Sequence, residues 1–121
     1  MARVGSKNTR PELIVRKLIW ALGYRYRLHV AKLPGKPDIV ITRLKKIIEV
    51  RGCFWHRHGC KLTTSPKTRI KFWQSKFERN IERDRRNIRM LKKAGWKVLV
   101  VWGCQLRNIE KARKRLNEFL Q

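Results

Sequence analysis

Two short apolar segments separated by only two residues restrict the fold of this chain more than any other feature. The segments are Asp38–Thr42 and Lys45–Arg51, with Arg43-Leu44 between them. Apolar runs of this length with so short a connection predict a β-hairpin. In such a hairpin Asp38 pairs with Glu49 across the ladder, so that their side chains lie on one face, roughly 5 Å apart.

The rest of the chain alternates between helical and strand patterns. Thr9 and Glu12 fit a capping box at the start of a helix that Gly23 ends. The later elements are predicted at Tyr24–Val30 (strand), about Lys67 to Ala94 (helix, with room for one break), Trp96–Trp102 (a buried central strand) and Asn108–Leu120 (amphipathic helix). This order predicts an α/β fold, with a mixed β-sheet flanked by helices. We expect one domain, residues 1–121, in which residues 1–8 form a short basic arm.

The charge of the chain indicates a polyanionic partner. Lys and Arg number 32 against 8 acids, which gives a net charge of +24. Nucleic acid is the commonest polyanion, and composition leaves a ribosomal-type binder, a chromatin protein and an enzyme open. No apolar stretch reaches the ~20 residues of a membrane span, and the N-terminus lacks the apolar run of a secretory signal. We therefore expect a monomeric, cytoplasmic, nucleoid-associated protein with double-stranded DNA as its partner and no membrane contact.

The few acids are informative because a phosphate-binding face gains nothing from them. Asp38 and Glu49 would repel each other unless a cation lies between them, and Mg²⁺ favours such a pair together with phosphate and water. Pro37-Asp38 followed by Glu49-Val50-Arg51 resembles the PD-(D/E)xK nuclease signature, with Arg in place of the usual Lys. Arg51 shares the face of the two acids, and because Arg keeps its proton it would stabilise phosphate charge. The alternative is that Asp38 caps a strand and Glu49 pairs with a surface Lys.

A cluster of cysteines and histidines predicts a structural zinc site. Zinc takes four N or S ligands in a tetrahedron. The predicted ligands are Cys53, His58, Cys60 and Cys104. Cys104 directly follows a predicted strand, so the site would tie the irregular segment 52–65 to the edge of the sheet. His56 is left over as a general base or acid, unless it exchanges roles with His58. Three thiols without a metal are the alternative.

Several motifs spread over nearly the whole chain resemble the very short patch repair (Vsr) endonucleases. They are Asn8-Thr9-Arg10-Pro11-Glu12, Leu33 to Asp38, Gly52-Cys53-Phe54-Trp55-His56, Phe72-Trp73 with Asn80, Glu82-Arg83-Asp84, and Gly95-Trp96 to Cys104. The resemblance implies a Mg²⁺-dependent nuclease with a PD-(D/E)xK-like fold that nicks DNA beside the T of a T·G mismatch. Two alternatives stay open: a nicking endonuclease without mismatch preference, and a zinc-bearing DNA-binding module that has lost catalysis.

The same resemblance implies roles for individual residues. Asp38 and the carbonyl of Val50 would bind the catalytic metal, and His56 would be the catalytic histidine, supported by Glu12 and Asp84. The four predicted zinc ligands match those of the family, and the aromatics that enter the DNA stack would be Phe54, Trp55 and Trp73. For Trp73, on a helix, a place in the core is the alternative. This chain departs from the best-known family pattern in having an acid at Glu49, Arg51 where that pattern has His, and a shorter N-terminal arm.

Overall fold

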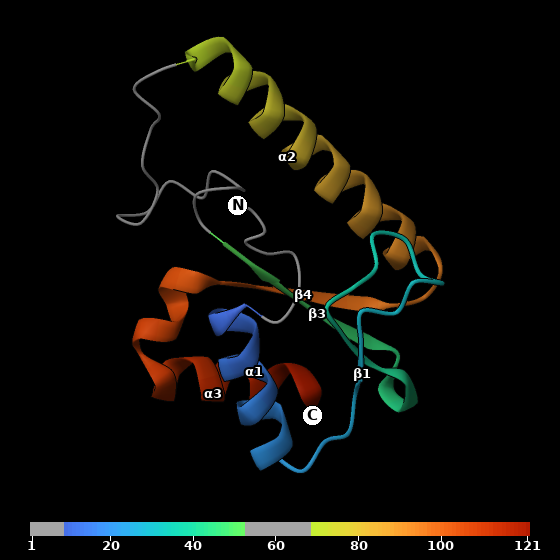
Figure 1. The fold of residues 1–121 in the computed structure, drawn as a ribbon. Coiled ribbons are helices and arrows are strands. Elements are labelled where there is room, and N and C mark those ends of the chain that lie inside the picture. Colours follow the sequence, from blue (N-terminus) through green and yellow to red (C-terminus); the bar gives the residue numbers. More distant parts are fainter. Residues whose placement is uncertain (1–8, 53–68) are drawn as a thin grey trace.

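The computed structural model describes residues 9–52 and 69–121, and it has the predicted order of elements (Figure 1). Seven helices and strands and two 3₁₀ turns are present in these ranges: α1 (Arg10–Ala21), β1 (Arg27–Leu28), β2 (Ile39–Ile41), η1 (Thr42–Leu44), β3 (Lys46–Arg51), α2 (Ile70–Lys93), β4 (Lys97–Trp102), η2 (Gly103–Arg107) and α3 (Ile109–Leu120). The predicted mixed sheet flanked by helices is confirmed.

The sheet has the order β1-β2-β3-β4, antiparallel except for the parallel pair β3 and β4. The prediction that Trp96–Trp102 is a buried central strand is wrong: β4 lies at an edge of the described sheet, and only Val101 of it is buried. The central strands are β2 and β3. A strand covered by helices on both faces needs apolar residues throughout, whether it is central or at an edge, so the apolar run could not distinguish the two.

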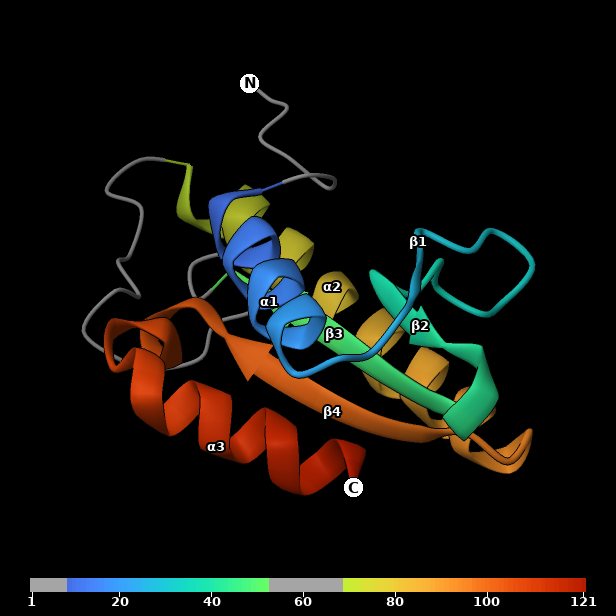
Figure 2. The same cartoon turned by 90° about the horizontal axis from the view of Figure 1, so that it is seen from below.

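Helices cover both faces of the sheet, with α1 and α3 on one face and α2 on the other (Figures 1 and 2). Side chains of β2 and β3 alternate between the two layers. Ile39 and Ile48 belong to the larger core with α1 and α3, whereas Val40 and Ile47 pack with Leu91 of α2. The hairpin is therefore buried on both faces, and any polar side chain at its open end lies next to a helix.

The hairpin has the predicted register but a wider turn. Ile39 pairs with Ile48 and Ile41 with Lys46, which extrapolates to Asp38 opposite Glu49. The predicted two-residue turn is replaced by η1 followed by Lys45 in the left-handed conformation (φ 54°). Two-residue hairpin turns favour Gly or Asn because they need positive φ, and the sequence offers neither here.

The first predicted strand is much shorter in the structure. Tyr24–Val30 was expected, whereas β1 covers only Arg27–Leu28. The Tyr24 N–H still donates to Ile19 O at the end of α1, and His29 leaves the extended conformation with φ 46°. The alternating arginines and aromatics of Tyr24–Arg27 therefore predicted a longer strand than the two residues that pair with β2.

The helix ends follow the sequence signals in part. Thr9 caps α1 by accepting from the Glu12 N–H (3.4 Å), but the Glu12 carboxylate turns into the protein, so the predicted capping box is half formed. The long helix α2 runs without the break for which the sequence left room and stops before Gly95 (φ 95°). Its C-terminal half lies over the sheet, while its N-terminal end rises away from it (Figure 1).

The loop before β2 approaches α2 so closely that Gly35 has no room for a side chain. A Cβ at Gly35 would lie 2.6 Å from Nδ2 and 3.1 Å from Cβ of Asn87, and Gly35 has φ +77°. We expect Gly35→Ala to lower the free energy of unfolding by about 1–3 kcal/mol, through left-handed strain and overpacking together. Urea denaturation measures this loss.

Gly23→Ala is the matched control for this substitution. Gly23 also has a positive φ (+94°), but a Cβ there meets no atom of the described residues within 4 Å. It should therefore report the backbone strain alone. Equal losses for the two variants would contradict a contribution from the contact with Asn87.

Candidate active site

Two acids meet where the β2–β3 ladder ends. Asp38 directly precedes β2, and its Oδ2 accepts a hydrogen bond from the Val50 N–H (2.8 Å). In return, Glu49 Oε1 accepts from the Asp38 N–H (3.4 Å). Glu49 is buried, with 8% of its surface exposed. The predicted juxtaposition of Asp38 and Glu49 on one face is thus present.

The same register places a backbone carbonyl at this end of the ladder. Val50 stands opposite Pro37, one step beyond the last printed pair of β2 and β3. The Val50 N–H points toward β2, and the carbonyl of a strand residue points to the same side as its N–H. Pro37 has no N–H to donate to that carbonyl. The Val50 oxygen therefore lies on the Asp38 side of β3. It receives no backbone hydrogen bond from the opposite residue, Pro37.

Helix α1 contributes a third acid. Glu12 is almost fully buried (2% exposed), and its Oε2 contacts the Arg16 guanidinium and lies 2.9 Å from His29 Nε2. The backbone N–H of His29 donates to Asp38 O (3.1 Å). Ligand atoms of Glu12, His29 and Asp38 all lie within 4.8 Å of one another. The acids of α1 and of the hairpin therefore form one cluster.

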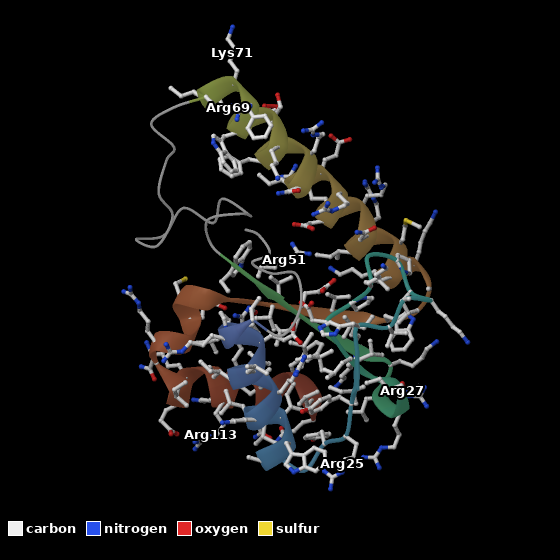
Figure 3. The ribbon with its side chains drawn as sticks, viewed as in Figure 1. Arg25, Arg27, Arg51, Arg69, Lys71 and Arg113 are labelled. Carbon is white, nitrogen blue, oxygen red and sulfur yellow. The ribbon has the colours of Figure 1, made fainter. Side chains whose placement is uncertain are left out.

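Helix α2 closes the site from the other face of the sheet. Arg51 Nη1 lies 3.6 Å from Asp84 Oδ2, and both side chains are largely buried. Figure 3 shows Arg51 on the α2 side of β3, whereas Arg25, Arg27 and Arg113 lie at the outer surface. Asp84 is directed at β3 because it shares the buried stripe of α2 with Phe77 and Leu91, at helical spacing.

The protonation of the two hairpin acids is shifted. Burial and the neighbouring Glu49 charge raise the pKa of Asp38 to about 7, against the opposing hydrogen bond from Val50. Burial also raises the pKa of Glu49, although Arg51 opposes the shift. Two carboxyl groups that resist ionisation together are a good fit for a divalent cation, which favours the charged form of both. Together with the Val50 carbonyl they could supply an all-oxygen donor set of the kind that Mg²⁺ accepts.

The raised pKa of Asp38 makes the stability of the protein pH-dependent when no Mg²⁺ is added. The folded protein keeps a proton on Asp38 up to about pH 7, whereas the unfolded chain releases it near the ordinary pKa of 3.8. The free energy of unfolding should therefore fall as the pH rises from about 4 to about 7, and level off above that. Urea denaturation at a series of pH values measures the slope. Asp38→Asn should flatten this window, and an unchanged slope in that variant would contradict the shift.

Other predicted site residues are placed outside this cluster or outside the described residues. Cys104 lies in η2, directly after β4 as expected. Trp73 lies near the start of α2, where its ring stacks on Phe77 (5.9 Å, 28°). The predicted catalytic His56, the aromatics Phe54 and Trp55, and the zinc ligands Cys53, His58 and Cys60 lie outside the described residues.

The structure gives the two supporting acids partners that the sequence did not predict. Glu12 contacts Arg16 and His29, and Asp84 contacts Arg51. Their predicted support of His56 stays a prediction, because His56 lies outside the described residues. The sequence analysis gave no role to Arg16 or His29. The Arg16 contact had a signal, since it is four residues from Glu12 on the same helix face. His29 had a weaker one: it is the last residue but one of the predicted strand Tyr24–Val30.

The fold is that of an endonuclease catalytic domain. The catalytic domain of the homing endonuclease I-Bth0305I superposes with a TM-score of 0.64 at 21% sequence identity, covering 93% of this chain and 94% of that one. A model of the family described as "DNA mismatch endonuclease Vsr" matches residues 1–62.

Two relatives place the chain more closely. The type II nicking enzyme V.XorIIP of Xanthomonas oryzae pv. oryzae is 47% identical over 99% of this chain and 88% of its own length. The DNA mismatch endonuclease Vsr of Escherichia coli is 42% identical over 92% of this chain and 71% of its own. This chain belongs to the Vsr family of DNA mismatch endonucleases.

Proposed function

We propose that this protein is a metal-dependent endonuclease that nicks one strand of duplex DNA at T·G mismatches, in very short patch repair. The observation that carries the proposal is the pair Asp38 and Glu49, opposed at the end of the β2–β3 ladder in a chain of net charge +24. Membership of the Vsr family, with a relative named DNA mismatch endonuclease, supports the reaction and its target.

Asp38, Glu49 and the Val50 carbonyl would hold Mg²⁺. When bound, such an ion activates water as a nucleophile and neutralises charge that develops on the phosphate. Arg51, held by Asp84, would bind a phosphate oxygen, and it cannot serve as the base because it does not lose its proton. The general acid or base in this proposal is His56, on the segment that follows β3.

Cys53, His58, Cys60 and Cys104 would bind a structural zinc ion. Cys104 at the end of β4 and the segment after β3 start from neighbouring positions, because Arg51 pairs with Trp102 in the parallel ladder. A tetrahedral ion there would fix the segment that carries His56, Phe54 and Trp55 next to the acids.

The partner proposed is double-stranded DNA, bound by a monomer in the cytoplasm with the nucleoid. The affinity for DNA would come from the 32 Lys and Arg side chains, because these neutralise the phosphates of the DNA backbone. Among the described residues, no helix combines the length and apolar character that crossing a bilayer requires.

A nicking endonuclease without mismatch preference is the second candidate. It is favoured by the 47% identity to a relative named type II nicking enzyme. A DNA-binding module without catalysis is disfavoured, because Asp38 beside Glu49 would only repel phosphates in such a protein.

Nicking of matched and T·G duplexes with Mg²⁺ distinguishes these candidates. We expect the wild type to cut one strand of the T·G duplex preferentially. Trp55→Ala should reduce that preference while general DNA binding survives, because a rigid ring enters a weakly paired step more easily than a matched one. Trp20→Ala, at an exposed tryptophan of α1, is the matched control. Equal cutting of both duplexes by the wild type would leave the second candidate.

A further inference from the structure

His29 is brought into the acidic cluster by the fold. Its Nε2 lies 2.9 Å from Glu12 Oε2, and ligand atoms of Glu12, His29 and Asp38 lie within 4.8 Å of one another. Ligand–metal distances near 2.1 Å set the ligand atoms of one octahedral ion about 3–4 Å apart. Small side-chain adjustments would therefore let these three atoms reach a single ion.

The backbone of His29 has an uncommon conformation that directs it to this place. Its φ is 46°, in the left-handed region that residues other than Gly adopt rarely. At this point the chain leaves β1, while the His29 N–H remains bonded to Asp38 O (3.1 Å). Backbone strain of this kind persists where the surrounding structure demands it, and it concentrates at functional sites.

Charge balance alone does not account for His29. Glu12 already has a cationic partner, because the Arg16 guanidinium contacts the same Oε2 atom. Asp38, in contrast, accepts a hydrogen bond from the Val50 N–H and lies beside a second acid, Glu49. The imidazole, with 15% of its side chain exposed, thus lies close to Asp38 as well as to Glu12.

We propose that His29 supplies a nitrogen ligand, beside Asp38 and Glu12, to the catalytic metal ion, and that the site consequently prefers Mn²⁺ to Mg²⁺. The inference rests on the proposed function, because it concerns the same ion. Mg²⁺ is bound almost only by oxygen in near-ideal octahedra, whereas imidazole nitrogen favours first-row transition ions. A mixed nitrogen and carboxylate set therefore shifts the preference toward Mn²⁺.

The test is Mn²⁺ binding to the full chain, followed by electron paramagnetic resonance without DNA. The protein is dialysed to remove weakly held divalent ions and titrated with Mn²⁺ alone, and then with Mg²⁺ as competitor. Electron spin-echo modulation of the bound Mn²⁺ reports a directly coordinated ¹⁴N nucleus. The wild type should show this coupling and bind Mn²⁺ about 10-fold more tightly than the variants.

Two variants separate ligation from a structural role. His29→Asn keeps a residue that tolerates the left-handed backbone, and His29→Gln keeps a side chain long enough to donate to Glu12. Both variants should lose the ¹⁴N coupling and most of the preference for Mn²⁺. Their Mg²⁺ affinity should change less than about threefold, and their unfolding temperature should stay that of the wild type. Coupling that persists in both variants, or that is absent from the wild type, overturns the proposal.

Asp38→Asn distinguishes failure of this inference from failure of the proposed function. If Asp38→Asn removes Mn²⁺ binding while the His29 variants bind as the wild type does, His29 is not a ligand but the acidic site stands. If Asp38→Asn binds Mn²⁺ as the wild type does, the proposed catalytic site itself is wrong, and the role of His29 falls with it.

Discussion

Asp38→Asn is expected to abolish nicking, with a loss of at least ~10³-fold, while DNA binding stays equal or becomes tighter. The substitution keeps the size of the side chain but removes the carboxylate at the centre of the cluster, which lies within reach of Glu12, His29, Glu49 and the Val50 N–H. Losing a metal ligand costs several kcal/mol of transition-state stabilisation, which corresponds to this factor. Binding should not suffer, because removing a negative charge from a phosphate-binding face reduces repulsion.

Single-turnover nicking and a binding titration at fixed salt measure the two effects separately. Glu110→Gln is the matched control, since it removes the same charge at an exposed site on α3, where Glu110 pairs only with Arg113 among the contacts of the described residues. Glu49→Gln should show a smaller but clear loss, and His56→Ala a loss of roughly 10²–10⁴-fold. Full activity of Asp38→Asn would contradict the assignment of the metal to this acid.

Cys104→Ala is expected to lose zinc and much of the stability of the folded state together. Cys104 lies in η2 between β4 and α3, and three further ligands are proposed from the segment after β3. In small domains the free energy of zinc binding is folding free energy, so losing one of four ligands should lower the unfolding temperature sharply and reduce soluble yield. Elemental analysis should find about one Zn²⁺ per chain in the wild type and much less in the variant.

A strong chelator supplies the control for the zinc prediction. Stripping the wild type should reproduce the lowered unfolding temperature of Cys104→Ala, and chelation should change the variant little. Freshly purified, soluble wild-type protein that contains no zinc would contradict the proposed zinc site. Cys104 would then not be a zinc ligand.

The hairpin was predictable from sequence because two apolar runs and their short connection fix the register. The width of its turn was not predictable, because Lys45 adopts a positive φ and Lys is not a residue type that indicates one. The edge position of β4 was hidden for a different reason: helices on both faces select the same apolar residues at an edge as at the centre. The turn thus depended on the local backbone of Lys45, and the edge position of β4 on the tertiary surroundings.

The candidate site shows the same division. Asp38 and Glu49 could be paired by counting along a ladder, because both belong to one hairpin. His29 could not, because its place depends on its own left-handed backbone directly after β1 and on Glu12, which is 17 residues away on a helix. Contacts of that range follow from how α1 packs on the sheet, and spacing along the chain does not record them.

The acids of the site come from α1, the start of β2, β3 and α2, so no short stretch of the chain carries them together. A nascent chain that has been synthesised only through β3 already contains Glu12, Asp38 and Glu49 but still lacks Asp84 and the α2 layer that covers Arg51. Fragments that end before α2 lack one wall of the site in the same way. We therefore expect nicking only from chains that have been synthesised past Asp84 and folded.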